Sequence, residues 1–411
     1  MSQSIRLDER INSIDTIRGV ALLGLLTMNL VGMAMPFGAY LQPLAYRADD
    51  MLNLPIFSIF FVFSDQKFMG MFSLLFGASV MLLIERLQSK GEPSLGVHYR
   101  RNIILIVMGL AHGAYLWEGD VLLIYGFCAL FLYPLHRCSP WVLTLFAVVL
   151  LAASAYSAGN FAGSIVDYSV DELYELRQLF NPSAESIADD KQLYSLSYQE
   201  IVAARWSIDE EIDVALMQFD VMMLMSSLYR AMGMMCLGMA LYKWRYLHGQ
   251  LPMALYKYGV SAGLLIGLPL AFWAWFAGVN SHWSIEGYLD HWGVLPVNTL
   301  ASVFLVLAYI SGIALLCRIQ WAPYVQKRFQ AVGQTALSNY LLQSLIGTTL
   351  MYGYGLGLWG ELARWQLVMI MLMIWGLQLW LAPWWLRYFR QGPVEYIWRC
   401  LTYFSLPPLR K

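Results

Sequence analysis

Charged residues are scarce in this chain. Only 13% of its 411 residues are Asp, Glu, Lys or Arg, whereas ordinary globular proteins have about 25%. The formal net charge of −1 gives no support for a nucleic-acid partner. The five cysteines are scattered and form no C-x-x-C pair, so neither a zinc site nor a disulfide framework is indicated, and we expect no metal.

Motifs of soluble nucleotide-binding and hydrolytic enzymes are missing in any usable form. The dipeptide Gly-Lys never occurs, which excludes a Walker A loop, and there is no H-E-x-x-H. A G-x-S-x-G match at 259–263 lies inside an apolar segment, without the strand-turn-helix elbow that the motif needs. A G-x-G-x-x-G match at 355–360 ends another apolar segment and has no βαβ unit around it. We regard both matches as chance.

Long apolar runs occur along the whole chain. Hydrophobic residues make up 59% of the chain, and 16 Trp and 25 Tyr suit the aromatic belts of membrane proteins. The runs predict an all-α, polytopic transmembrane helix bundle that forms a single domain over residues 1–411. We expect about ten spans, at 14–37, 55–85, 101–118, 120–135, 140–161, 214–241, 255–278, 294–317, 333–358 and 366–387. The second span is over-long, and the polar residues 64–67 interrupt it.

Positive charges set the predicted orientation. With the N-terminus inside, the cytoplasmic segments hold eighteen Lys and Arg residues and the outer segments hold five. This bias predicts that both termini are cytoplasmic. The outer loop at 163–213 contains an expected amphipathic helix over 168–180. It either caps a site or serves as a solvated connector, and residues 389–411 form a cytoplasmic tail.

Three polar residues interrupt the first span. Arg18 and Asn29 are eleven positions apart, so they share a helix face about 16 Å from each other. A buried arginine costs about 2.5–3.5 kcal/mol, which favours an inward-facing Arg18 paired with Asp15. Alternatively, Asp15 caps the helix and Arg18 reaches the inner headgroups. That alternative does not explain Asn29.

His112 is the histidine expected deepest in the membrane. It lies eleven residues after Arg101, about 16 Å from the inner interface, between Gly109 and Gly113, whose spacing lets a neighbouring helix approach closely. Asp120 follows two turns later. His112 either faces a functional cavity or makes a helix–helix hydrogen bond. Further polar residues at similar depth indicate a polar cavity in the bundle: Asp65, Gln66, Lys67, Arg230, Ser338, Asn339 and Gln343.

Five segments in order resemble the YeiB-like family of bacterial membrane proteins, a family with a domain of unknown function. They are "RINSIDTIRGVALLGLLTMNL", "KFMGMFSLLFGASVMLLIER", "RRNIILIVMGLAHGAYLWEGDVLLIYG", "VGQTALSNYLLQSLIG" and "GPVEYIWRCLTY". The first is also similar to the start of the lysosomal heparan-α-glucosaminide N-acetyltransferases, where D-x-x-R-G and an asparagine recur at this spacing. It is similar as well to acyltransferase-3 proteins, in which a comparable D-x-x-R is followed by a histidine where Asn29 stands here. The resemblance implies a multi-pass protein of the bacterial inner membrane that moves an acyl group from cytosolic acyl-CoA to a sugar outside.

On this hypothesis the donor is acetyl-CoA or another acyl-CoA, and the polar residues take defined roles. Arg10, Arg100 and Arg101, with Arg86 and Lys90, are candidates to hold the nucleotide phosphates, and Asp15 and Arg18 shape the inner channel. His112 serves as general base or as nucleophile, Asp120 orients it, and Asn29 stabilises the oxyanion. Expected partners are membrane lipids, acyl-CoA and an extracytoplasmic glycan, with a homo-oligomer left open.

Two other functions fit the same sequence. A secondary transporter or flippase would use the polar cavity without acyl chemistry, although no second copy of the first block is evident in the C-terminal half. A non-catalytic scaffold would tolerate loss of His112 and Asn29.

Overall fold

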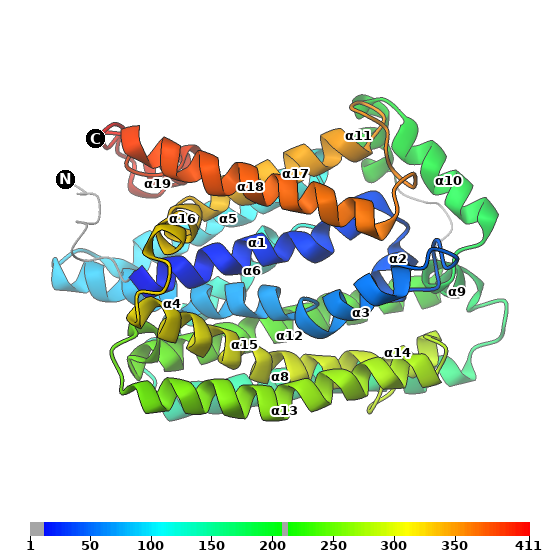
Figure 1. Cartoon of the computed structure of the whole chain (residues 1–411), viewed down its shortest axis with the longest axis horizontal. Coiled ribbons are helices and arrows are strands. Elements are labelled where there is room, and N and C mark those ends of the chain that lie inside the picture. Colours follow the sequence, from blue (N-terminus) through cyan, green and yellow to red (C-terminus); the bar gives the residue numbers. More distant parts are fainter. Residues whose placement is uncertain (1–11, 208–212) are drawn as a thin grey trace.

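Helices form all of the regular structure over residues 12–207 and 213–411, the ranges that this computed structural model describes (Figure 1). The all-α fold predicted from the sequence is therefore confirmed. The α-helices are α1 (Asn12–Ala34), α2 (Phe37–Leu41), α3 (Asn53–Phe63), α4 (Lys67–Ser89), α5 (Ser94–Tyr115), α6 (Leu122–Leu130), α7 (Leu132–Leu135), α8 (Pro140–Ser164), α9 (Tyr174–Phe180), α10 (Ala184–Ser195), α11 (Tyr198–Trp206), α12 (Val214–Lys243), α13 (Met253–Asn280), α14 (Ile285–Leu289), α15 (Val294–Arg318), α16 (Pro323–Gln334), α17 (Ala336–Met351), α18 (Arg364–Tyr388) and α19 (Pro393–Tyr403).

Seven helical segments within the described ranges are long and apolar enough to cross a membrane. They comprise α1, α3 with α4, α8, α12, α13, α14 with α15, and α18. These segments establish a multi-helix membrane protein. The expected spans at 101–118, 120–135 and 333–358 correspond to α5, to α6 with α7, and to α17, which do not meet the same criterion, so the total of ten stays a prediction.

Several helix boundaries differ from the expected ones. The over-long second span is two helices, as the polar residues 64–67 indicated, and Gln66 has a left-handed backbone with φ of 63° where the chain turns. The expected span at 333–358 bends at Thr335 and its helix ends at Met351. The amphipathic helix expected over 168–180 is shorter, because only Tyr174–Phe180 is α-helical.

Glycines allow the central helices to touch backbone to backbone. A Cβ atom on Gly19 of α1 would lie 2.0 Å from the carbonyl oxygen of Phe329 on α16. On α4 and α12, a Cβ atom on Gly77 would lie 2.0 Å from Met235 O, and one on Gly238 would lie 1.8 Å from Leu74 O. Such small-residue contacts are the usual means of close helix packing in membranes. The contact at Gly19 packs α16 directly against α1, the helix with the polar residues, which lies in the middle of the bundle (Figure 1).

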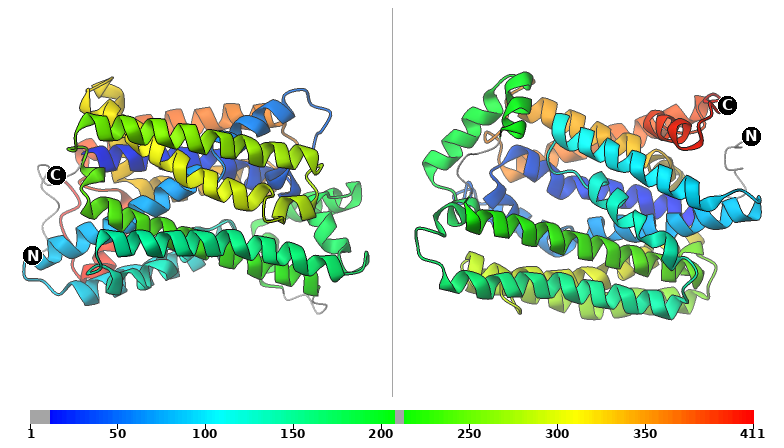
Figure 2. Two further views of the ribbon diagram at one scale, coloured as in Figure 1. Left: turned by 90° about the horizontal axis from the view of Figure 1, so that it is seen from below. Right: turned by 180° about the vertical axis from the view of Figure 1, so that it is seen from behind.

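The two ends of the bundle differ in what covers them. The start of α1 and helix α19 lie at one end, and α9, α10, α11 and α14 lie at the other (Figure 1). Figure 2 shows the same division from below and from behind. We call the α19 end the inner end and the α10 end the outer end, following the orientation that the positive charges predict.

Candidate functional site

A cavity of about 340 Å³ lies at the inner end and is rich in arginine. Its apolar wall includes Leu25, Phe72 and Phe76. Its charged side chains are five arginines and two acids: Arg18, Arg86, Arg101, Arg390, Arg399, Asp15 and Glu395. Because the arginines outnumber the acids, this inner cavity is suited to an anionic ligand.

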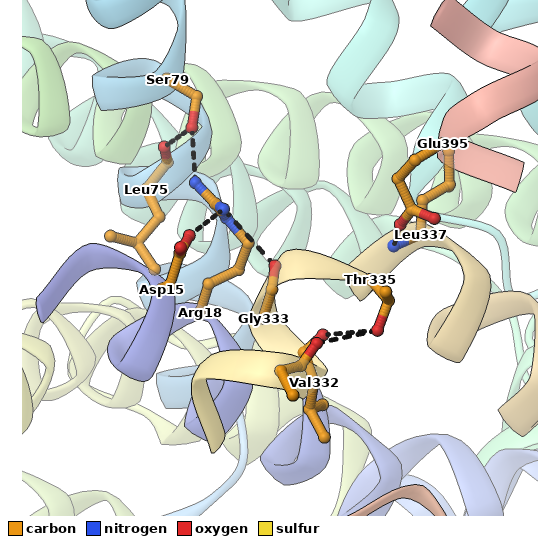
Figure 3. A network of polar contacts seen from close by, with 10 residues as sticks. Asp15, Arg18, Leu75, Ser79, Val332, Gly333, Thr335, Leu337 and Glu395 are labelled. Carbon is orange, nitrogen blue, oxygen red and sulfur yellow. Dashed lines mark hydrogen bonds and ion pairs between the residues drawn. The ribbon is translucent and has the colours of Figure 1, made fainter. Parts of the chain in front are cut away.

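Arg18 joins three helices at the edge of the inner cavity (Figure 3). One of its nitrogens lies 3.0 Å from Asp15 Oδ1, and another donates to Ser79 Oγ of α4 at 3.0 Å. The guanidinium also donates to the carbonyl of Gly333 on α16 at 3.4 Å. Arg18 therefore faces into the bundle and pairs with Asp15, the first of the two arrangements that the sequence left open.

Helix α19 closes one wall of the inner cavity. Its Glu395 carboxylate accepts hydrogen bonds from the amides of Leu337, at 2.6 Å, and Ser338, at 3.1 Å, which begin α17, and from the Ser338 hydroxyl. Figure 3 shows Glu395 facing Leu337. The Arg101 guanidinium lies 4.4 Å from the ring centre of Trp398, whose indole nitrogen donates to Arg101 O at 2.9 Å. The predicted tail is thus packed into the wall of the cavity.

Only some of the arginines that the sequence suggested for phosphate binding line the inner cavity. Arg101 and Arg86 line the inner cavity. Arg100 does not line it, because its side chain donates to Thr402 O at 3.1 Å and lies over the Phe404 ring. Arg10 lies outside the described residues. Arg390 and Arg399 were missed as cavity residues, since their basic segment gives no sign in the sequence that α19 folds back on the bundle.

A second cavity, of about 640 Å³, lies towards the outer end. Asn29 and Asp120 line this outer cavity, and Asn29 makes no side-chain hydrogen bond to any residue in the described ranges. The outer loop contributes Glu175 and Asp190 to the wall, from α9 and α10. The outer loop therefore forms part of the cavity wall, and its role as a cap stays a prediction.

His112 contacts Asp120, which lines the outer cavity, whereas His112 itself lines neither of the two cavities. His112 Nδ1 lies 2.8 Å from Asp120 Oδ1, and the two side chains are 1% and 5% exposed. The contact is close but not aligned as a hydrogen bond, and His112 Nε2 is buried without a hydrogen-bond partner in the described ranges. Catalytic hydrogen bonds often align only when substrate is bound. The other Asp120 oxygen accepts from Leu123 N at 2.7 Å and so caps α6.

Gly109 makes this arrangement possible. A Cβ atom there would lie 2.4 Å from Leu123 N and 2.8 Å from Asp120 Oδ2, so α5 and α6 touch through it. Figure 2 shows these two helices side by side. At Gly113 a Cβ atom would lie 3.9 Å from the Cβ of Asp120, which is ordinary contact. Of the two glycines that the sequence singled out, the first is the one that lets the helices meet.

The two cavities share part of their walls. Leu25 and Val121 line both of them. Tyr340 lines the inner cavity, its ring centre lies 5.3 Å from that of His112, and its hydroxyl accepts from Val121 N at 3.4 Å. His112 therefore contacts one residue of each cavity wall, Tyr340 of the inner cavity and Asp120 of the outer cavity.

Other polar residues predicted at this depth pair with each other. Lys67 is fully buried and donates to Asn298 Oδ1 at 2.5 Å and to Phe61 O at 2.8 Å, while Asn298 donates to Asp65 at 2.6 Å. Gln343 donates to the side chain of Gln378 at 2.9 Å. These contacts hold the helices together. No group of three or more His, Cys, Asp or Glu in the described ranges is arranged to hold a metal ion.

The apolar helices and the buried polar groups define a polytopic α-helical membrane protein. The profile of the family described as "Protein of unknown function (DUF418)" matches residues 241–405. The chain is 30% identical to the uncharacterized protein YeiB of Escherichia coli (strain K12), over 97% of this chain and 98% of that protein. It is 27% identical to the uncharacterized protein YxaH of Bacillus subtilis (strain 168), over 98% and 97%. The chain belongs to the YeiB-like family.

Proposed function

We propose that this protein is a transmembrane acyltransferase of the bacterial inner membrane. It moves an acyl group, with acetyl as the simplest case, from cytosolic acyl-CoA to an acceptor such as a sugar on the other side. The observation that carries the proposal is the pair of cavities that approach each other from opposite ends and share Leu25 and Val121. The thioester is made on one side of the membrane and the acceptor lies on the other side. The two can react only where a cavity from each side joins.

The inner cavity supplies the features that an acyl-CoA donor needs. CoA carries a 3′-phosphate and a diphosphate, and guanidinium groups bind phosphate in bidentate fashion. Arg86, Arg101, Arg390 and Arg399 supply those groups at the inner end, while the apolar wall suits the pantetheine arm. Arg18, which is already bound to Asp15, fixes the shape of the entrance rather than the phosphates.

The chemistry takes place beside Val121. In direct transfer, His112 Nε2 takes the proton of the acceptor hydroxyl while the oxygen forms its bond to the thioester carbonyl. The carbon–sulfur bond then breaks, and the proton leaves with the CoA sulfur. Asp120 holds the imidazole by Nδ1, and Asn29 donates to the carbonyl oxygen as its charge develops. Because His112 is buried behind Tyr340, this ring moves aside for the reaction.

A transporter or flippase is the second candidate, because two cavities in line also fit alternating access. The arginine-rich inner cavity favours acyl transfer, since a carrier for a neutral solute has no need of phosphate-binding side chains. Ligand stabilisation of the purified protein distinguishes the two functions.

The test measures thermal unfolding in detergent with acetyl-CoA, free CoA or ATP. A ligand that binds the folded state at 100 times its Kd adds about 2.7 kcal/mol, which raises the midpoint measurably. Arg101→Gln should lose the shift produced by acetyl-CoA, whereas the neighbouring Arg100→Gln should keep it. His112→Ala should keep the shift and lose transfer of labelled acetyl to sugars. Absence of any shift with acetyl-CoA in the wild type would favour the transporter.

A further inference from the structure

Among the residues that the structure describes, Arg230 is the one cation of the outer cavity wall, and it lies near the middle of α12. It is the seventeenth of the thirty residues of α12. Within the described part of the chain, its guanidinium makes one hydrogen bond, from a terminal nitrogen to the sulfur of Met69 at 3.6 Å, and its Nε is buried without a hydrogen-bond partner. Within residues 12–207 and 213–411, no carboxylate lies at ion-pair distance from it. Arginine has five donors, and a thioether is a weak acceptor.

Two other cations of the bundle, Arg18 of α1 and Lys67 of α4, are paired. Arg18 has Asp15, the hydroxyl of Ser79 and a carbonyl. Lys67 has an amide oxygen and a carbonyl, and Asn298 links it to Asp65. Ionisable residues in the membrane normally pair with one another or face a pathway for a substrate or ion. Arg230 follows the second pattern, because it faces the cavity and lacks the pairing.

The acids of the outer cavity wall that lie outside α9 and α10 are already engaged. Asp65 accepts from Asn298 and interacts with Arg230 only through space, and Asp120 contacts His112 and caps α6. Glu118 lies 2.9 Å from Arg205 and accepts from the Tyr194 hydroxyl. The two remaining acids of the wall belong to α9 and α10 at the outer end. The charge left without a partner deep in the cavity is therefore positive.

We propose that Arg230 is the oxyanion-binding residue of the outer cavity, and that the ligand entering there carries a carboxylate or phosphate group. A guanidinium facing a cavity of about 640 Å³ has the geometry to bind such a group through two parallel hydrogen bonds. Tyr40, Trp117, Tyr288 and Trp359 add aromatic faces to the same wall, which suit an anionic sugar. That this ligand is the acyl acceptor rests on the proposed function, whereas the binding itself does not.

The test compares an anionic sugar with the neutral sugar of similar shape and adds inorganic phosphate as a second anion. Thermal unfolding of the detergent-purified protein is measured at constant ionic strength with D-glucuronate, D-glucose and inorganic phosphate. We expect glucuronate to raise the midpoint more than glucose does, and this increment to vanish in Arg230→Gln. Arg230→Lys should keep part of it, and Arg177→Gln should keep all of it, because Arg177 is half-exposed at the outer surface and pairs with Glu286 at 3.8 Å.

The same variants show whether Arg230 is needed for ligand binding or for folding. They also show whether the bound oxyanion belongs to a soluble ligand or to a lipid. Without ligand, Arg230→Gln should unfold at or above the wild-type midpoint, because it removes a charge that lacks a close partner. Mixed micelles with phosphatidylglycerol or phosphatidylcholine provide the lipid comparison. If only phosphatidylglycerol raises the unfolding midpoint, and does so in the wild type but not in Arg230→Gln, the oxyanion belongs to a lipid headgroup. If glucuronate or phosphate raises the midpoint in this way, it belongs to a soluble ligand.

Two results would overturn the proposal: equal stabilisation by all anionic and neutral ligands, or an anion-dependent increment that survives in Arg230→Gln. A large loss of stability in Arg230→Gln without ligand would also overturn it, by making Arg230 a structural partner of Asp65. The shift with acetyl-CoA is recorded on the same preparations. Its absence would count against the proposed acyltransferase and leave the outcome at Arg230 unaffected.

Discussion

Replacing Gly109 by alanine is the sharpest test of how the His112–Asp120 site is built. The new methyl group would lie 2.4 Å from Leu123 N and 2.8 Å from Asp120 Oδ2. Both atoms belong to the start of α6, where Asp120 caps the helix and contacts His112. The substitution therefore displaces the carboxylate without changing either residue of the pair.

The magnitude follows from the steric distances. Real Cβ atoms essentially never approach other atoms within 3.0 Å, so α6 must move by about 0.6 Å to clear Leu123 N. Overpacking of this kind costs about 1–3 kcal/mol. Gly→Ala in a helix interior also stabilises the folded state by about 1 kcal/mol, because alanine has the higher helix propensity. Gly113→Ala makes the same change one turn later in ordinary contact, so the two variants should differ by about 1–3 kcal/mol, the steric cost alone.

The assay is thermal unfolding of both variants in one detergent, followed by transfer of labelled acetyl. We expect Gly109→Ala to unfold below Gly113→Ala and to lose transfer while it keeps its stabilisation by acetyl-CoA, because the arginines of the inner cavity belong to elements other than α6. Equal unfolding midpoints would refute the reasoning, since they would mean that α5 and α6 are not in backbone contact at Gly109.

Three further predictions concern other parts of the bundle. Gly19→Ala should lower the unfolding midpoint, because its methyl group would lie 2.0 Å from Phe329 O, whereas Gly376→Ala meets nothing within 4 Å and should not lower it; equal midpoints would contradict the α1–α16 contact. Lys67→Met should cost about 1–3 kcal/mol in chemical unfolding, because it leaves the buried oxygens of Asn298 and Phe61 without their donor, and a neutral result would contradict these two hydrogen bonds. Burial raises the pKa of the Glu395 carboxyl, so its contribution to stability is complete below its ordinary pKa of about 4.3 and is lost as the pH rises through the raised value. Wild type should therefore lose stability relative to Glu395→Gln as the pH rises, and a relative gain would mean that the hydrogen bonds to the ionised form outweigh burial.

Features that depend on a few neighbouring residues were predicted correctly. The break in the second span follows from the polar residues that interrupt the apolar run, and the structure places it at Ser64–Gln66. The contact between Asp15 and Arg18 follows from their i, i+3 spacing on one helix. The close approach at Gly109 follows from the small residue itself. In each case the cause is contained in a short stretch of chain.

The phosphate-binding arginines could not be assigned in the same way. Arg100 and Arg101 are adjacent, so their side chains point about 100° apart on the helix, and charge alone does not say which one faces a cavity. The rotation of α5 in the bundle turns Arg101 inwards and leaves Arg100 against Thr402. Arg390 and Arg399 enter the cavity wall because α19 folds back on α17, a contact between segments about sixty residues apart.

The sequence by itself determined the class of this protein: an all-α membrane bundle with polar groups buried at a few depths, because hydrophobicity and helical hydrogen bonding act locally along the chain. Only the tertiary structure decided which of those polar groups satisfy each other and which face a cavity. It joined Lys67 to Asn298, placed Asp120 against His112, and left Arg230 without a close anion. The physical reason is that these outcomes depend on how helices distant in sequence are rotated and spaced when they pack.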